Sequence, residues 1–249
     1  MPFCENKMER LILLFIATVF PFYSCVSSSE IKNALNHNVF TIIIDAGHGG
    51  KENGTVVTHI IDDKEITFTE KDMTLKIAKA LAVCLSEKMP QMEIILTRTE
   101  DVYMSKEERV KKYENIKGSK VIFVSIHLNY SPNKDMSGFE VYYYLPALLD
   151  PKAYITVLYS MDTIKKNSSL AKSIFTVIDN IPELKDTSKS MKNGDYYVLK
   201  NANVPSVLIE CGFLSNEKEA LLLNTESYNE KLIEGIALGI EEYLKAKNN

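Results

Sequence analysis

Apolar runs and helix-like periodicity alternate along the chain. Four apolar runs predict strands, at 39–44, 92–96, 121–126 and 139–144. Runs that are apolar and β-branched throughout are typical of strands buried on both faces of a sheet. Two shorter apolar runs predict further strands at 196–199 and 207–209. Segments with apolar residues at helical spacing predict three helices: 71–89, 169–181 and 225–246. A polar helix is expected to begin at a capping box, Ser105 with Glu108, and to end before Gly118.

This alternation predicts an α/β fold. We expect a single domain with a mostly parallel central sheet of about six strands, flanked by helices on both faces. The chain shows no internal repeat and no second domain. The connection at 145–167 has no clear periodicity, which is typical of either a lid or an additional helix.

The first residues have the pattern of an export signal. Lys7 and Arg10 precede ten strongly apolar residues, Leu11 to Phe20. This run is short for a membrane span and has the length of the apolar region of a signal peptide. We therefore expect a signal peptide at 1–24, a polar linker at 25–38 and the folded domain at 39–247.

Two interpretations of the cleavage site remain. Phe22-Tyr23-Ser24-Cys25 resembles a lipobox, in which the cysteine becomes acylated, whereas ordinary cleavage would fall between Ser24 and Ser28. In both cases we expect an exported protein of the periplasm or cell envelope. Membrane contact would then occur only through a lipid on Cys25.

Composition excludes several classes of protein. Lys plus Arg number 29 and Asp plus Glu 33, which gives a net charge of −4 and argues against a nucleic-acid partner. Apolar residues make up 45% and charged residues 25%, so the chain is not intrinsically disordered. Four cysteines are too few for a disulfide scaffold at this length.

Three polar residues stand at the ends of predicted strands. His48, His127 and Glu210 each follow an apolar run. The carboxyl ends of parallel strands form the ligand crevice of an open α/β sheet, so we expect these residues to converge. Two histidines and a carboxylate are a recurring catalytic zinc set. The other two histidines are weaker candidates, because His37 lies in the linker and His59 in a predicted polar loop.

The carboxylate that would complete a zinc site is not fixed by spacing. Glu70 opens the helix that follows the His48 loop, and Glu65 and Asp72 are alternatives. An acid in a first helical turn also complements the helix dipole, which would explain Glu70 without a metal.

Glu210 is expected to be at least partly buried, because it directly follows an apolar strand. Burial raises the pKa of a carboxyl group and suits a general base that works near neutral pH. The alternative is a buried ion pair, for example with Arg98. The neighbouring Cys211 is interpreted as a small core residue.

Several motifs follow one another in an order that is typical of one enzyme family. They extend over roughly 39–245: Ile43-Ile-Asp-Ala-Gly-His-Gly-Gly50, Glu70-Lys-Asp72, Leu96-Thr-Arg-Thr-Glu-Asp101, Ser105-Lys-Glu-Glu-Arg109, Ser125-Ile-His-Leu-Asn129, Gly138-Phe-Glu-Val-Tyr-Tyr143, Tyr197-Val-Leu199 and Pro205-Ser-Val-Leu-Ile-Glu-Cys-Gly-Phe-Leu-Ser-Asn216. In these motifs the chain resembles the zinc-dependent N-acetylmuramoyl-L-alanine amidases.

The resemblance implies Zn²⁺ on His48, Glu70 and His127, with Glu210 as the catalytic acid. It implies a peptidoglycan hydrolase that uses zinc-activated water to cleave the amide bond between N-acetylmuramic acid and L-alanine. Peptidoglycan is the expected partner, and an activator protein is a further one. The alternatives are a zinc metallopeptidase of the carboxypeptidase or aminopeptidase type and a catalytically inactive homologue that binds peptidoglycan.

The chain departs from the family pattern at a few positions. Ala46 and Leu128 replace the usual Pro and Ala, and both changes look tolerable. Lys189 stands where the family often has Arg, so a planar fork of donors is lost and substrate contacts in this segment are expected to differ. Asp45 is expected either to hydrogen-bond a liganding His or to cap the turn. Arg98 and Asn129 are expected either to position substrate or to brace the site.

Overall fold

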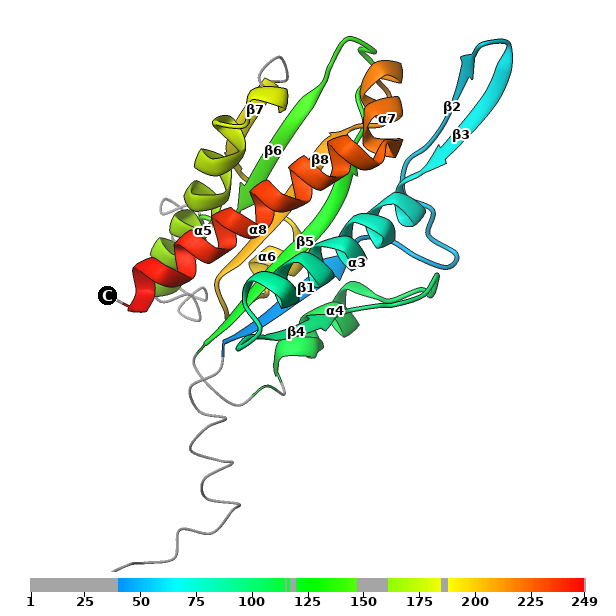
Figure 1. Ribbon diagram of the computed structural model, residues 1–249. Coiled ribbons are helices and arrows are strands. Elements are labelled where there is room, and N and C mark those ends of the chain that lie inside the picture. The colour runs from blue at the N-terminus through cyan, green and yellow to red at the C-terminus, as the bar shows by residue number, and fades with distance from the viewer. Residues whose placement is uncertain (1–39, 115, 117–119, 147–160, 185–187, 249) are drawn as a thin grey trace, which may run out of the picture. The chain divides into compact units, whose positions relative to one another are not determined.

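The computed structural model describes residues 40–114, 116, 120–146, 161–184 and 188–248. Its centre is a six-stranded sheet with the strand order β4-β1-β5-β8-β6-β7 (Figure 1). The strands are β1 Thr41–Ala46, β4 Glu93–Leu96, β5 Val121–Asn129, β6 Gly138–Tyr143, β7 Ser188–Asn193 and β8 Ser206–Phe213. β4, β1, β5 and β8 are mutually parallel, β6 is antiparallel to β8, and β7 is parallel to β6. The mostly parallel sheet predicted from the sequence is confirmed, whereas the predicted signal peptide and linker lie outside the described residues.

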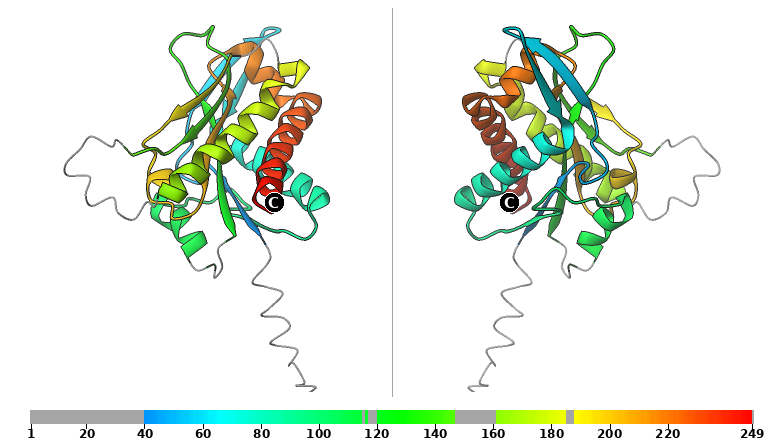
Figure 2. Two further views of the ribbon diagram at one scale, coloured as in Figure 1. Left: turned by 90° about the vertical axis from the view of Figure 1, so that its left-hand side faces the viewer. Right: turned by 90° about the vertical axis from the view of Figure 1, so that its right-hand side faces the viewer.

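Helices cover both faces of the sheet, as Figure 2 shows from the side. One face packs against α3 Glu70–Lys88, α5 Met161–Asp179 and α8 Glu226–Asn248. The other face packs against α4 Lys106–Glu114 and α6 Tyr197–Lys200. The short helices α7 Glu217–Asn224 and η2 Pro182–Leu184 complete the described set. Among the described helices, none has the length and hydropathy needed to cross a bilayer.

Alternation along each strand decides which side chains can reach the site. In β8, Ile209 and Cys211 belong to the larger core under α3, α5 and α8, while Leu208 belongs to the core on the opposite face. Glu210 therefore shares the face of Leu208. The interpretation of Cys211 as a core residue is confirmed, since it is fully buried and burial raises the pKa of its thiol.

A hairpin that the sequence analysis did not predict projects away from the sheet (Figure 1). It consists of β2 Val56–Ile61 and β3 Lys64–Thr69, joined by a two-residue turn. Asp62 and Asp63 have φ values of 49° and 59°, as a type I′ turn requires. His59 therefore lies in strand β2 and not in the predicted polar loop. Its ring is buried there and forms a hydrogen bond with the Leu214 carbonyl.

The second half of the chain contains one wrong prediction and several shifted boundaries. The run at 196–199 is not a strand, because it forms the single helical turn α6. The outer strand is β7, which was missed because its Lys and Ser residues give no apolar signal. The helix expected at 169–181 begins already at Met161, so the 145–167 connection ends in helix, while 147–160 lies outside the described residues. The capping box at Ser105 is present, and its two reciprocal hydrogen bonds open α4.

Candidate active site

The three strands that carry the predicted site residues are parallel neighbours. β1 pairs with β5, and β5 pairs with β8 in a register that places His127 directly opposite Glu210. His48 follows two residues after the end of β1. The convergence expected from the strand ends is therefore confirmed by the topology.

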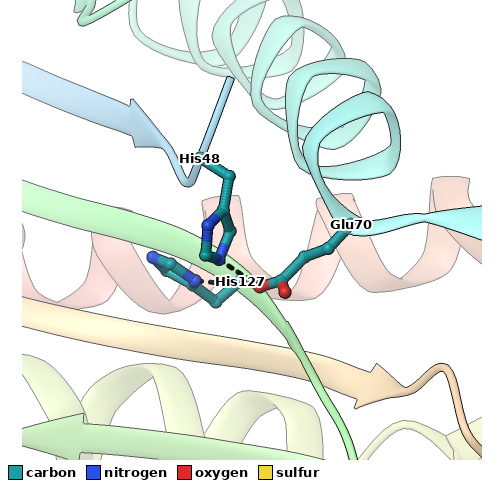
Figure 3. A group of neighbouring side chains, drawn as sticks. All are labelled: His48, Glu70 and His127. Atoms are coloured by element: carbon teal, nitrogen blue, oxygen red, sulfur yellow. Dashed lines mark hydrogen bonds and ion pairs between the residues drawn. The ribbon is translucent and has the colours of Figure 1, made fainter. Parts of the chain in front are cut away.

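Two histidines meet one carboxylate at this edge (Figure 3). Oε1 of Glu70 lies 3.1 Å from Nε2 of His48 and 3.0 Å from Nδ1 of His127. The three residues each offer a ligand atom, and these atoms all lie within 4.8 Å of one another. The alternatives do not join this cluster: Glu65 is exposed on β3, and Asp72 accepts a hydrogen bond from the Thr69 hydroxyl.

Glu70 is held in place as the first residue of α3. Its side chain is buried, with 4% of the residue exposed. The backbone N–H of Thr55 donates to Oε2 over 2.8 Å, and that of Leu128 donates to Oε1 over 3.1 Å. Burial alone would raise the pKa of this carboxyl, but the hydrogen bonds with His127 and His48 hold it well below its usual range. Glu70 is thus a fixed anion between two imidazoles.

The loop that carries His48 is strained and clamped. His48 has φ = 58°, a left-handed conformation that is uncommon outside glycine. Arg109 donates to the His48 carbonyl over 2.6 Å and to the Ala46 carbonyl over 2.7 Å. Arg98 donates to the Gly47 carbonyl over 2.8 Å. The two guanidinium groups therefore satisfy the successive backbone carbonyls of this loop.

Asp45 is the counter-ion of this clamp. Its Oδ1 lies 2.6 Å from Nη1 of Arg109 and accepts a 2.7 Å bond from Thr97, and its Oδ2 accepts a 2.7 Å bond from Ser125. Although burial opposes ionisation, the Arg109 charge and these hydrogen bonds hold the pKa of Asp45 below its usual value. Asp45 thus bonds Arg109, Thr97 and Ser125 instead of the liganding His that was one expectation for it. The contacts of Arg98 favour bracing the loop.

Glu210 is buried without an ion pair among the described residues. The residue is 8% exposed, and its Oε2 has no hydrogen-bond partner in the part of the chain that is described. The alternative of an ion pair with Arg98 is wrong, because Arg98 donates to backbone carbonyls instead. Burial raises the pKa of Glu210 to about 7, with His127 opposing the shift and Glu70 adding to it. Such a carboxyl exchanges protons readily near neutral pH.

The donor set fits a divalent metal. Two imidazole nitrogens and one carboxylate oxygen are the three protein ligands of many catalytic zinc sites, which keep a fourth position for water. The orphaned Oε2 of Glu210 is a second sign, since a buried acceptor without a partner is costly unless a ligand or water uses it. His48, Glu70 and His127 could therefore hold a metal beside a proton acceptor.

A group of polar side chains with no role predicted from the sequence lies next to Glu210 in the sheet. Glu140 of β6 lies opposite Glu210 in the sheet and forms an ion pair with Lys192 of β7. Glu140 stands in the Gly138–Tyr143 motif that resembles the family, but only the antiparallel pairing of β6 with β8 brings it to the site. Lys189 is different, since it pairs with Asp179 of α5 over 3.7 Å.

Comparison with known proteins gives one consistent result. Residues 42–242 match the family described as N-acetylmuramoyl-L-alanine amidase. An endolysin of Bacillus phage SPP1 is 33% identical over 204 residues, which make up 82% of this chain but only 66% of that protein, slightly less than two thirds. The crystal structure of an N-acetylmuramoyl-L-alanine amidase from Clostridium difficile 630 is 32% identical with a TM-score of 0.65, and the match covers 84% of this chain and 99% of that one. The CwlD amidase from Clostridioides difficile, solved in complex with the GerS lipoprotein, is 31% identical with a TM-score of 0.63 and coverage of 83% and 99%.

Proposed function

The chain belongs to the N-acetylmuramoyl-L-alanine amidase family, and from this premise we propose that it is a peptidoglycan hydrolase. The bond cleaved is the amide between the lactyl group of N-acetylmuramic acid and the L-alanine of the stem peptide. One observation carries the proposal: the cluster of His48, Glu70 and His127 stands beside the buried Glu210, whose Oε2 has no hydrogen-bond partner among the described residues.

We propose that His48, Glu70 and His127 hold Zn²⁺. A zinc ion in such a site acidifies a water molecule and polarises the carbonyl under attack. The anionic state of Glu70 supports this assignment, because a metal ligand must be deprotonated. The backbone donors on Glu70 and the clamp on the His48 loop fix the ligands before a metal binds.

Glu210 is proposed to move the proton. Its carboxylate accepts a proton from the attacking water while the water oxygen bonds to the lactyl carbonyl carbon. The same proton then passes to the alanine nitrogen as the carbon–nitrogen bond breaks. The products are a lactyl carboxylate on the glycan and a stem peptide with a free amino group on L-alanine.

The cellular setting belongs to the same proposal. Peptidoglycan is the proposed substrate and lies outside the cytoplasm, so the protein would act in the periplasm or cell envelope after removal of residues 1–24. A lipid on Cys25 would be its membrane anchor. A second protein is a further proposed partner, since the related CwlD amidase is in complex with a lipoprotein.

Product analysis tests the proposed function. We predict that the zinc-loaded protein releases stem peptides that begin with a free L-alanine, and that a chelator abolishes this release. Mass spectrometry of digested peptidoglycan identifies the bond that is cut. Cuts within the stem peptide would instead support the metallopeptidase alternative, and zinc binding without any product would support an inactive binding protein.

Gly54 offers a separate test of the metal site. A Cβ atom there would lie 2.5 Å from Oε2 of Glu70 and 2.6 Å from Cδ2 of His48, and the backbone φ is +64°. We predict that Gly54→Ala weakens zinc binding by about 10- to 100-fold, as displacement of supporting groups around metal ligands does. Competition with a chromophoric chelator measures the affinity without reference to activity. An unchanged zinc affinity would mean that the ligands do not depend on this loop.

A further inference from the structure

A row of side chains extends from the candidate metal cluster across three adjacent strands. His127 of β5 lies opposite Glu210 of β8, and Glu210 lies opposite Glu140 of β6. Directly paired residues place their side chains on the same face of a sheet. The row therefore continues past the proposed proton acceptor to a carboxylate that the hydrolysis does not use.

Glu140 is fixed by several donors. The residue is buried, with 7% exposed, and its Oε2 accepts a 2.6 Å bond from the Tyr142 hydroxyl and a 3.0 Å bond from Nδ2 of Asn129. Its Oε1 accepts a hydrogen bond from Nζ of Lys192 and a longer one, 3.4 Å, from the Ser190 hydroxyl. A carboxylate bonded on both oxygens cannot move freely, so it holds the Lys192 ammonium in one place.

Lys192 has an ammonium group that is held by an ion pair but remains accessible to solvent. Its side chain is 45% exposed, although its ammonium is paired with the buried Glu140. An ammonium group has three N–H donors, and the hydrogen bonds found among the described residues engage it through Glu140. The ammonium also lies 5.8 Å from the centre of the Tyr142 ring, which borders the same place. A held and accessible cation beside a catalytic centre suits the binding of an anion.

We infer that Lys192 binds the α-carboxylate of the second stem-peptide residue, and that Glu140 is the positioning residue that presents the Lys192 ammonium. This inference rests on the proposed function. The second residue of a stem peptide is a glutamate linked onward through its side-chain carboxyl, so its α-carboxyl is either a free anion or an amide. Lys192 would thus make the enzyme prefer the acidic form of the substrate.

The spacing agrees with this assignment. Opposed side chains on neighbouring strands begin about 5 Å apart, and a charged hydrogen bond adds about 3 Å. Since Lys192, two residues along β7 from the position opposite Glu140, bonds the Glu140 carboxylate, its ammonium lies within roughly 8 Å of Glu210. In an extended peptide, two residues span about 7 Å. That is the separation of the scissile carbonyl carbon and the α-carboxyl carbon of the second residue. A stem peptide laid along the row with its scissile bond at Glu210 therefore brings its first free carboxylate to Lys192.

The test compares two synthetic muramoyl peptides that differ only at the second residue, with a free α-carboxylate in one and an amide in the other. For the zinc-loaded protein we expect the acidic peptide to have the higher kcat/KM. Lys192→Gln should lower kcat/KM about tenfold for the acidic peptide, mainly through KM, as the loss of one partly exposed charged hydrogen bond implies. The same variant should leave the amidated peptide within about twofold, and Lys192→Arg should restore the preference.

Lys189→Gln is the matched control, because Lys189 lies on the same strand but pairs with Asp179 of α5. It should reduce the rates for both peptides equally or leave both unchanged. Equal losses on both peptides for Lys192→Gln would show that Lys192 is merely structural and would overturn this inference while the amidase function stands. No hydrolysis of either peptide by the unmodified protein would overturn the proposed function as well.

Discussion

Glu210→Gln is expected to lower kcat by about 1,000-fold, within the range that a general acid–base group contributes. Glutamine has nearly the same shape but cannot accept and return a proton. The three proposed zinc ligands are separate residues, so zinc content should stay at one ion per chain. The raised pKa of Glu210, about 7, arises chiefly from burial, and the neutral glutamine removes this titration. The loss should therefore be chemical and not structural.

Single-turnover rates on a soluble muramoyl peptide, together with zinc analysis, measure this effect. Glu219→Gln is the matched control, because Glu219 is another buried glutamate whose pKa burial raises to about 7. Its carboxylate accepts hydrogen bonds from the backbone N–H groups of Gly138 and Phe213, so its loss should affect thermal stability more than kcat. A Glu210→Gln enzyme with full zinc and near-normal kcat would exclude Glu210 as the proton carrier.

Arg109→Ala is expected to destabilise the fold by about 3–5 kcal/mol, the usual effect of removing one partner of a buried ion pair. The substitution leaves Asp45 ionised and buried and frees the carbonyls of Ala46 and His48. For a domain of this size the change corresponds to a fall in Tm of about 10 °C. The clamp on the His48 loop would be lost at the same time.

The pH dependence of this destabilisation has a definite sign. The folded-state pKa of Asp45 lies below its usual value of 3.8, so the pair stabilises the fold above that value and loses its effect as the pH falls through the folded pKa. The difference in Tm between Arg109→Ala and the unmodified protein should therefore be full at pH 7 and shrink below about pH 4.

Thermal unfolding followed by circular dichroism provides the measurement. Lys111→Ala on the same helix is the control, because Lys111 is exposed and such changes usually stay within about 0.5 kcal/mol. If Arg109→Ala unfolded at the same temperature as Lys111→Ala, the buried pair of Asp45 and Arg109 would contribute nothing to the free energy of unfolding.

The sequence predicts the inner part of the fold better than its edges. β1, β5 and β8 are covered on both faces, so each contains a continuous run of at least three apolar residues and the strands stand out. β7 at the outer edge is polar and partly exposed, and the hairpin of β2 and β3 has little core to face. The apolar residues of α6 fill the smaller core from a single helical turn, which is too short to show helical spacing.

The candidate site follows the same logic. His48, His127 and Glu210 could be found because each stands where an apolar run ends, and the ends of parallel strands meet. Glu70 needed the family resemblance, because spacing alone favours it without excluding Glu65 and Asp72. Glu140 could not be found in this way, since it reaches the site from the beginning of a strand that runs in the opposite direction.

The antiparallel strand β6 separates two groups of proposed functional residues within one sheet. The proposed metal ligands belong to the part of the sheet formed by β1 and β5 and to the start of α3, whereas Glu140 and Lys192 belong to β6 and β7. The outer strands contact β5 through the 3.0 Å bond from Asn129 to Glu140, and among the described residues no hydrogen bond of Glu140 or Lys192 reaches His48, Glu70 or His127. We therefore expect substitutions in β6 and β7 to change which modified cell walls are cleaved more than they change the proposed hydrolytic centre.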